Sequence, residues 1–188
     1  TATPTAAPPA GQRATAPRPV RVFLSYAPRD EELLRRLEVH MNRMKREGLI
    51  APWHSGEIGA GEDVESAISE QLEEADLILL LVSASFLASE EGDAQVTRAM
   101  ERRDAGQATV VPILLRRCDW ETTRLAGLQW LPRGMPRDLP EQTRKSLLEE
   151  CKDHKPLAVT RWPDEDEAFL QVVVEIRALA TKLRASLR

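Results

Sequence analysis

The sequence lacks the long apolar runs of membrane and exported proteins. Its longest uninterrupted apolar run covers residues 77–82, far short of the roughly 18 residues that a membrane-spanning helix needs. The N-terminal residues also lack the apolar core of a signal peptide. We therefore predict no membrane partner, no export and a cytoplasmic location.

Cysteine is also scarce. The chain has two cysteines and three histidines. Cys118 and Cys151 lie far apart and neither has a CxxC or Cys/His spacing. Such a pattern excludes a disulfide framework, disfavours a zinc site and suits the reduced thiols of the cytosol. The sequence thus predicts no metal and no resident cofactor.

An excess of positive charge is missing as well. The formal net charge is −4 and the isoelectric point is about 5.5, which disfavours nucleic acid as a partner. The basic residues that cluster are Arg98, Arg102, Arg103, Arg116 and Arg117. We interpret them as a solvated helix face and a strand end rather than a phosphate-binding patch.

The length and composition fit one domain with a tail. The 188 residues are 42% apolar, which is enough for a single core. Residues 1–19 are rich in Pro, Ala and Thr and have almost no bulky apolar side chains, so we predict a disordered linker there. Residues 20–188 form the predicted domain. The chain begins at Thr1, and we expect it to be a piece of a longer protein.

Five short apolar segments have the pattern of β-strands. Residues 77–82 are continuously apolar, as in a central parallel strand that is buried on both faces. Pro112 interrupts another segment, which indicates an edge strand or a bulge. The predicted strands cover residues 20–26, 49–53, 77–82, 109–115 and 157–160.

The segments between these strands have the pattern of helices. Residues 30–47 carry an apolar stripe at helical spacing, with Asp30 as a possible cap and Gly48 as a stop. Alternating strands and helices predict an α/β fold: a flavodoxin-like doubly wound sheet of about five parallel strands with helices on both faces. The predicted helices cover residues 30–47, 62–74, 94–105, 141–151 and 168–187.

Several nucleotide-binding motifs are missing from this framework. The first strand ends in Ser25-Tyr26 and the central strand is followed by Ser83, so no carboxylate stands where a phospho-receiver needs one. A GxxxxGK[ST] phosphate loop is also missing. The segment 59–64 has Val64 in place of the third glycine of a dinucleotide fingerprint, and acids crowd the helix start.

The order of short motifs along residues 20–185 resembles a Toll/interleukin-receptor (TIR) domain of the bacterial kind. No single motif is specific, but the ordered set is. Residues 135–153 have no counterpart and are predicted to form a helical insertion. The motifs are Phe23-Leu24-Ser25-Tyr26, Asp30-Glu31-Glu32-Leu33, Lys45–Ile50 with Trp53-His54, Leu72–Ser83, Phe86–Ser89, Val111-Pro112-Ile113, Arg117–Trp120 and Asp164–Phe169.

This resemblance implies the TIR fold and two kinds of function. Some TIR domains are scaffolds that assemble with other TIR domains through the loop after the second strand. Others, common among bacterial and plant members, cleave the nicotinamide–ribose bond of NAD⁺. In these enzymes a glutamate on the helix after the third strand faces the ribose, where a fixed negative charge stabilises the developing positive charge. For this chain we expect self-assembly and a role in bacterial signalling or antiphage defence.

Here the position of that glutamate is Gln95, in the frame Gln95-Val96-Thr97-Arg98-Ala99-Met100. An amide can bond a ribose hydroxyl but carries no charge. Losing such an interaction typically costs about 10²–10³ in rate, so we predict a weak or inactive NADase. Residues 90–93 are predicted as a turn in solvent, although a shift of one residue in the alignment would bring Glu91 to the site.

The resemblance also implies ligand contacts and an assembly loop. The implied NAD⁺ contacts are Phe23, Ser25, Tyr26, Arg29 and Trp53. Each has an alternative role in packing, in a turn or in an ion pair. The implied assembly loop, which its glycines should make mobile, consists of Ser55, Gly56, Glu57, Ile58, Gly59, Ala60 and Gly61. A non-enzymatic homotypic module and an unrelated flavodoxin-like binder remain as alternatives.

Overall fold

The computed structural model describes residues 18–136, 139–152 and 155–187. The predicted linker lies almost entirely outside the described residues. Among the described helices, none has both the length and the apolar character required to cross a membrane.

The centre of the molecule is a parallel sheet in the order β2-β1-β3-β4. The strands are β1 (Val20–Ser25), β2 (Ile50–Trp53), β3 (Leu77–Val82) and β4 (Thr109–Leu114). All residues of β3 are buried between β1 and β4, which confirms the predicted central strand. Pro112 lies in the edge strand β4, also as predicted, and needs no donor toward a further strand.

The predicted fifth strand is wrong. The sheet of the described residues has four strands, and residues 157–160 instead lead into a 3₁₀ turn, η5 (Val159–Arg161). The Thr160 amide donates to the Leu115 carbonyl at 3.1 Å, but no ladder follows. Leu157 and Val159 are buried in the core, so the apolar pattern of this segment reflects packing rather than strand pairing.

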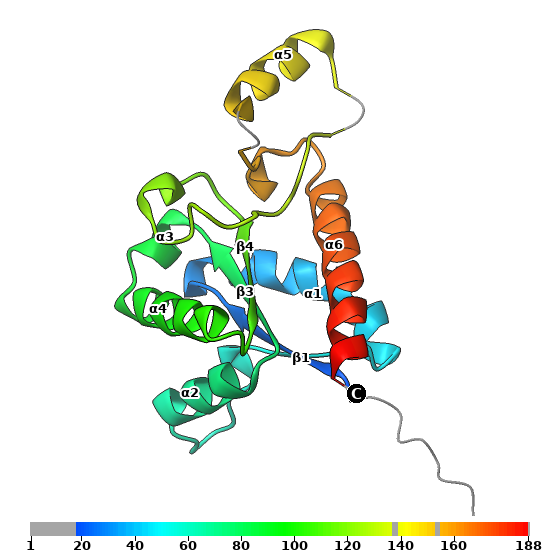
Figure 1. Ribbon diagram of the computed structural model, residues 1–188. Helices are drawn as coiled ribbons and strands as arrows, with labels where there is room; N and C mark the ends of the chain where they lie inside the picture. The colour runs from blue at the N-terminus through cyan, green and yellow to red at the C-terminus, as the bar shows by residue number, and fades with distance from the viewer. Residues whose placement is uncertain (1–17, 137–138, 153–154, 188) are drawn as a thin grey trace, which may run out of the picture.

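Helices cover both faces of the sheet (Figure 1). Helices α1 (Glu31–Arg46) and α6 (Glu165–Ser186) pack on one face, where Val22 and Leu24 of β1 point. Helices α2 (Val64–Glu74), α3 (Ala84–Leu87) and α4 (Glu90–Asp104) lie on the other, where Phe23 points. The sheet therefore separates two apolar cores, and the doubly wound α/β architecture is confirmed.

Helix α1 is held by the predicted apolar stripe but not by the predicted cap. All five stripe residues are buried. Asp30 occupies the cap position without a side-chain bond to the helix, because its carboxylate is engaged elsewhere. Gly48 ends the helix with a φ of 63°, a conformation that glycine adopts without the steric cost of a side chain. The stripe residues are Leu33, Leu34, Leu37, Met41 and Met44.

Helix α4 begins four residues before the predicted start at residue 94. The predicted turn at residues 90–93 is its first turn, and the Ser89 hydroxyl caps it by accepting from the Gly92 amide at 2.9 Å. A Cβ on Gly92 would lie 2.5 Å from the Phe86 carbonyl oxygen. Gly92 is thus a close-packing position between α3 and α4, although glycine in a sequence usually indicates a turn.

The remaining helix, α5 (Glu141–Glu150), lies within the predicted insertion and projects from the top of the molecule (Figure 1). Leu147 anchors it to the core on the α1 and α6 side.

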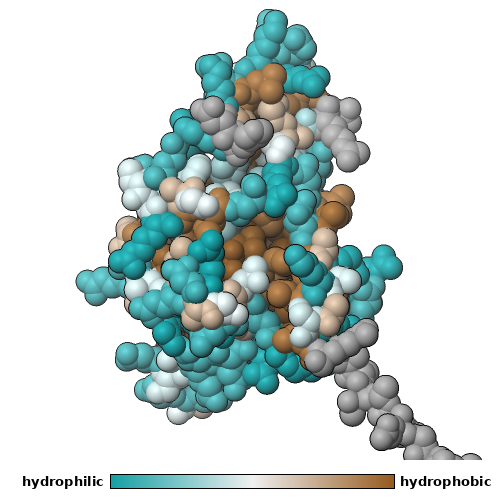
Figure 2. Space-filling view, in the orientation of Figure 1, coloured by the Kyte–Doolittle hydropathy of each residue, from teal (hydrophilic) through white to brown (hydrophobic). Residues whose placement is uncertain are grey.

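Below α5, apolar surface gathers in the middle of the face shown in Figure 2, where edge strand β4 lies between α4 and α6. A groove of about 440 Å³ beside Val111 and Leu179 belongs to this region.

Candidate functional site

Ser25 and Gln95 meet at the carboxyl end of β1. Ser25 is the last residue of β1, and Gln95 lies in the second turn of α4 on the side that faces the sheet. The Ser25 hydroxyl donates to Oε1 of Gln95, and the two residues are 2% and 9% exposed. The structure therefore brings together the predicted catalytic position and one predicted ligand contact.

The other end of the Gln95 amide is also engaged. Its Nε2 donates to Oε1 of Glu91, one helical turn earlier, at 3.0 Å. Glu91 is exposed, so its carboxylate retains access to water. A neutral chain of hydrogen-bonded groups thus connects the buried end of β1 to a surface carboxylate.

Gln95 and Glu91 border a cleft of about 490 Å³ between α2 and α4. This volume is within the range typical of small-molecule sites. Apolar side chains of α2, among them Ile68 and Leu72, form its other wall. Arg98 also lines the cleft, but its guanidinium bonds the carboxylates of Glu73 and Glu101, which raise its pKa.

Phe23 and Trp53 lie together but away from this cleft. Their rings stack with centroids 5.5 Å apart and an angle of 25° between the planes. Both line a separate groove of about 300 Å³ beside β2 and α2, together with Gln71 and Glu74. The stack covers the sheet and leaves the rim of Trp53 partly exposed.

Tyr26 packs on the α1 side of the sheet, and Arg29 is exposed to solvent. The Tyr26 ring meets the His54 ring edge-on, with centroids 5.7 Å apart. Arg29 is exposed in the 3₁₀ turn η1 (Pro28–Asp30) and pairs with no acid among the described residues. Of the five predicted ligand contacts, only Ser25 forms a side-chain hydrogen bond with Gln95 in the described residues.

The predicted assembly loop follows β2 and is partly ordered by local bonds. It begins with the 3₁₀ turn η2 (Ser55–Glu57) and continues to Gly61, whose φ is 89°. Ile58 packs against the core on the α2 side, and the Gly59 amide donates to Glu62 at 3.2 Å. Most of the loop is exposed, so it is available to a second molecule.

A second polar network at the carboxyl ends of the strands was missed by the sequence analysis. Asp30 is fully buried and accepts a hydrogen bond from the Ser83 hydroxyl at 2.5 Å and another from Nε of Arg116 at 2.7 Å. Ser83 directly follows β3, and Arg116 lies two residues after the end of β4. Polar residues just after parallel strands meet at one edge of the sheet, and that signal was present in the sequence.

A comparison with protein families identifies the family of this chain. The family model described as "TIR domain" matches residues 22–148. The chain belongs to the TIR domain family. The match begins in β1, contains both Ser25 and Gln95, and ends within α5.

Other comparisons give a bacterial relative and two solved structures. Protein y4lF of Sinorhizobium fredii (strain NBRC 101917 / NGR234), named as an uncharacterized protein, is 42% identical over 163 residues. That match covers 86% of this TIR domain chain but 44% of the relative, so the chain spans less than half the length of that protein.

The solved structures are similar at low identity. The TIR domain of the Toll-related receptor TRR-2 from Hydra magnipapillata is 19% identical, covers 87% of this chain and 97% of its own, and has a TM-score of 0.48. The TIR domains of the activated Roq1 resistosome, which directly recognizes the effector XopQ, are 16% identical, with coverages of 89% and 96% and a TM-score of 0.47.

Proposed function

We propose that this TIR domain self-assembles and binds NAD⁺ at the cleft between α2 and α4, and that it cleaves the nicotinamide–ribose bond weakly or not at all because Gln95 replaces a glutamate. We also propose that it serves in a bacterial signalling or defence protein. The observation that carries the proposal is the buried contact of Gln95 with Ser25 at the edge of this cleft.

The chemistry of the bond explains why the amide matters. As the nicotinamide leaves, positive charge develops on the ribose, and a fixed carboxylate stabilises that charge. The Gln95 amide occupies the same place with no charge. Arg98 lines the cleft from α4, as Gln95 does, and would oppose a cationic transition state, but Glu73 and Glu101 already balance its charge.

Self-assembly is proposed to use the loop of residues 55–61. This loop is mostly exposed and follows β2, an edge strand of the sheet. Its glycines make ordering more costly in entropy. This cost weakens the association, so we expect assembly only at high protein concentration.

The second candidate function is a non-enzymatic homotypic scaffold. It is favoured by the hydrogen bonds of Gln95, since Ser25 and Glu91 engage both ends of its amide. These two bonds fix the orientation of the amide, so only the second lone pair of Oε1 and the second N–H of Nε2 remain for a ligand. In this case the domain acts only by bringing other domains together.

One comparison of variants separates the two candidates. NAD⁺ loss is measured at high protein concentration for the chain and for Gln95→Glu, with Gln95→Ala as the matched control that also removes the amide. Activity gained by Gln95→Glu alone supports the enzyme. Silence of all three proteins, with oligomers visible by light scattering, supports the scaffold.

A further inference from the structure

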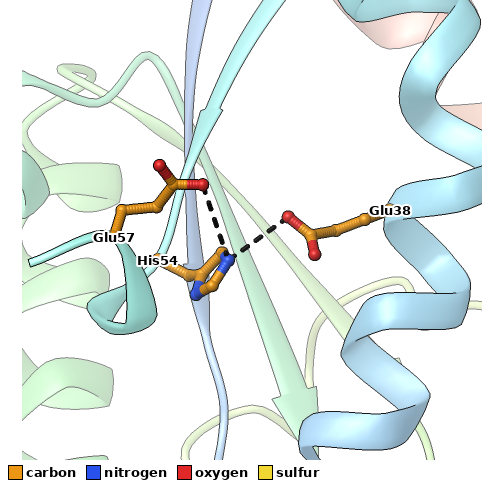
Figure 3. Close-up of side chains that lie close together, drawn as sticks. All are labelled: Glu38, His54 and Glu57. Carbon is orange, nitrogen blue, oxygen red and sulfur yellow. Dashed lines mark ion pairs between the residues drawn. The ribbon is translucent and has the colours of Figure 1, made fainter.

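Three potential metal ligands come together at the start of the loop of residues 55–61, although the sequence analysis predicted no metal site. Glu38 lies on α1, while His54 and Glu57 belong to the segment that follows β2 (Figure 3). Nε2 of His54 lies 3.3 Å from Oε1 of Glu38 and 3.8 Å from Oε1 of Glu57. Figure 3 shows both carboxylates directed at the same ring nitrogen, one from α1 and one from the segment after β2.

The charges in this cluster do not balance. A neutral imidazole has one N–H, so Nε2 can donate a proton to only one of the two carboxylates. Both carboxylates are therefore held close together around a single donor. The His54 side chain is only 14% exposed, which limits the screening of this repulsion by water.

The spacing fits a small divalent cation. Zinc binds imidazole nitrogen and carboxylate oxygen at about 2.0–2.2 Å with tetrahedral geometry, which puts neighbouring ligand atoms about 3.4 Å apart. The three ligand atoms here all lie within 4.8 Å of one another, so small rotations of the two glutamates suffice. We propose that Glu38, His54 and Glu57 bind a divalent transition-metal ion such as Zn²⁺, leaving a fourth position open.

Binding has a consequence for the loop. Nδ1 of His54 accepts a hydrogen bond from the Gly56 amide at 3.1 Å, so the ring proton resides on Nε2. A metal ion on Nε2 moves that proton to Nδ1 and turns Nδ1 into a donor. The Gly56 amide must then turn away, and the 3₁₀ turn η2 changes conformation. The ion thereby ties the loop to α1 and reshapes its first residues.

Calorimetric titration of the full chain with ZnCl₂ tests the site. We expect one ion per chain, weaker binding by on the order of 100-fold in His54→Gln, and by about 10-fold in Glu38→Gln and in Glu57→Gln. MgCl₂ binds far more weakly, because imidazole suits zinc better than magnesium. The matched control is His40→Gln, since His40 also lies near an acid, Asp166, at 3.4 Å.

Melting temperature and nitrogen NMR distinguish binding at His54 from adventitious zinc binding elsewhere on the chain. Zinc raises the melting temperature of the chain and of His40→Gln but not of His54→Gln. Nitrogen NMR of the His54 ring shows the proton moving from Nε2 to Nδ1, and far-UV circular dichroism verifies that each variant is folded. The proposal is overturned if zinc does not saturate one site, or if His54→Gln binds zinc as tightly as the unchanged chain. This proposal does not depend on the one for NAD⁺.

Discussion

Two polar networks lie at the carboxyl ends of the strands, one built around a buried acid and the other around a buried neutral amide. On the α1 side, Asp30 is a fully buried acid that bonds Ser83 and Arg116. On the α4 side, Gln95 is a buried amide that bonds Ser25 and Glu91. In both networks a serine at the end of a strand donates to a side chain from a neighbouring element.

The difference is the presence of a cation. Arg116 supplies a charge-assisted bond to Asp30, which offsets the cost of burying the carboxylate. Among the described residues, no unpaired cation lies beside Gln95, because Arg98 is held by Glu73 and Glu101. A glutamate at position 95 would lie close to Glu91 without a cation of its own. The positive charge that develops on the ribose during NAD⁺ cleavage would stabilise such an acid.

The charged network is the more costly one to break. Asp30→Ala should lower the free energy of unfolding by about 2–4 kcal/mol, because it leaves Ser83 and the Arg116 guanidinium without their acceptor. Urea denaturation measures this loss. Asp104→Ala is the control, since Asp104 pairs with Arg103 on the surface, and it should cost less than about 0.5 kcal/mol. Equal effects of both substitutions would contradict a structural role for Asp30.

Replacing Ser83, in the charged network, should destabilise the fold more than replacing Ser25, in the neutral one. Ser83→Ala should cost about 1.5–3 kcal/mol, because its hydroxyl donates to an ionised acid and also caps α3 through the Phe86 amide. Ser25→Ala removes a bond between neutral groups and should cost about 0.5–1.5 kcal/mol. Thermal unfolding of the two variants side by side gives the order. A larger loss in Ser25→Ala would mean that Gln95 is held more strongly than Asp30.

A further prediction concerns Cys118, which lies close enough to Asp30 to respond to its charge. Burial, the Asp119 charge and then the Asp30 charge raise the pKa of the Cys118 thiol to about 11. Only the thiolate reacts, so at pH 8 the reactive fraction is on the order of 100-fold smaller than for a thiol with an ordinary pKa.

Iodoacetamide labelling of Cys151→Ser, which isolates Cys118, measures this pKa. Labelling should stay slow to pH 9 and accelerate as the pH approaches 11. Fast labelling with a midpoint near pH 8.5 would show that Cys118 is open to water and insensitive to its acidic neighbours.

Much of the fold could be predicted from periodicity. The bounds of β3 were predicted to the residue and those of α1 within one, because a continuous apolar run and a helical stripe are strong local signals. The error at residues 157–160 has a physical cause. Burial of Leu157 and Val159 produces the same apolar pattern whether the backbone pairs in a sheet or packs as an irregular segment.

The site was predictable only in part. The contact between Ser25 and Gln95 joins two positions that the family resemblance had singled out. Asp30 was interpreted as a helix cap. The positions of Ser83 and Arg116 after neighbouring strands indicate that they share a sheet edge, but they do not show which acid the two residues bond. The cluster of Glu38, His54 and Glu57 has no characteristic spacing, because α1 and the segment after β2 bring it together only in the folded chain.

The most direct test of the central claim is the rate of NAD⁺ loss in Gln95→Glu relative to the unchanged chain. Both proteins are assayed at equal, high concentration, and nicotinamide is quantified as the product. We expect Gln95→Glu to be about 10²–10³-fold faster, because a carboxylate would then face the developing charge on the ribose. Equal rates in the two proteins, with both folded and assembled, would contradict the account of Gln95 as the residue that silences an NAD⁺-cleaving site.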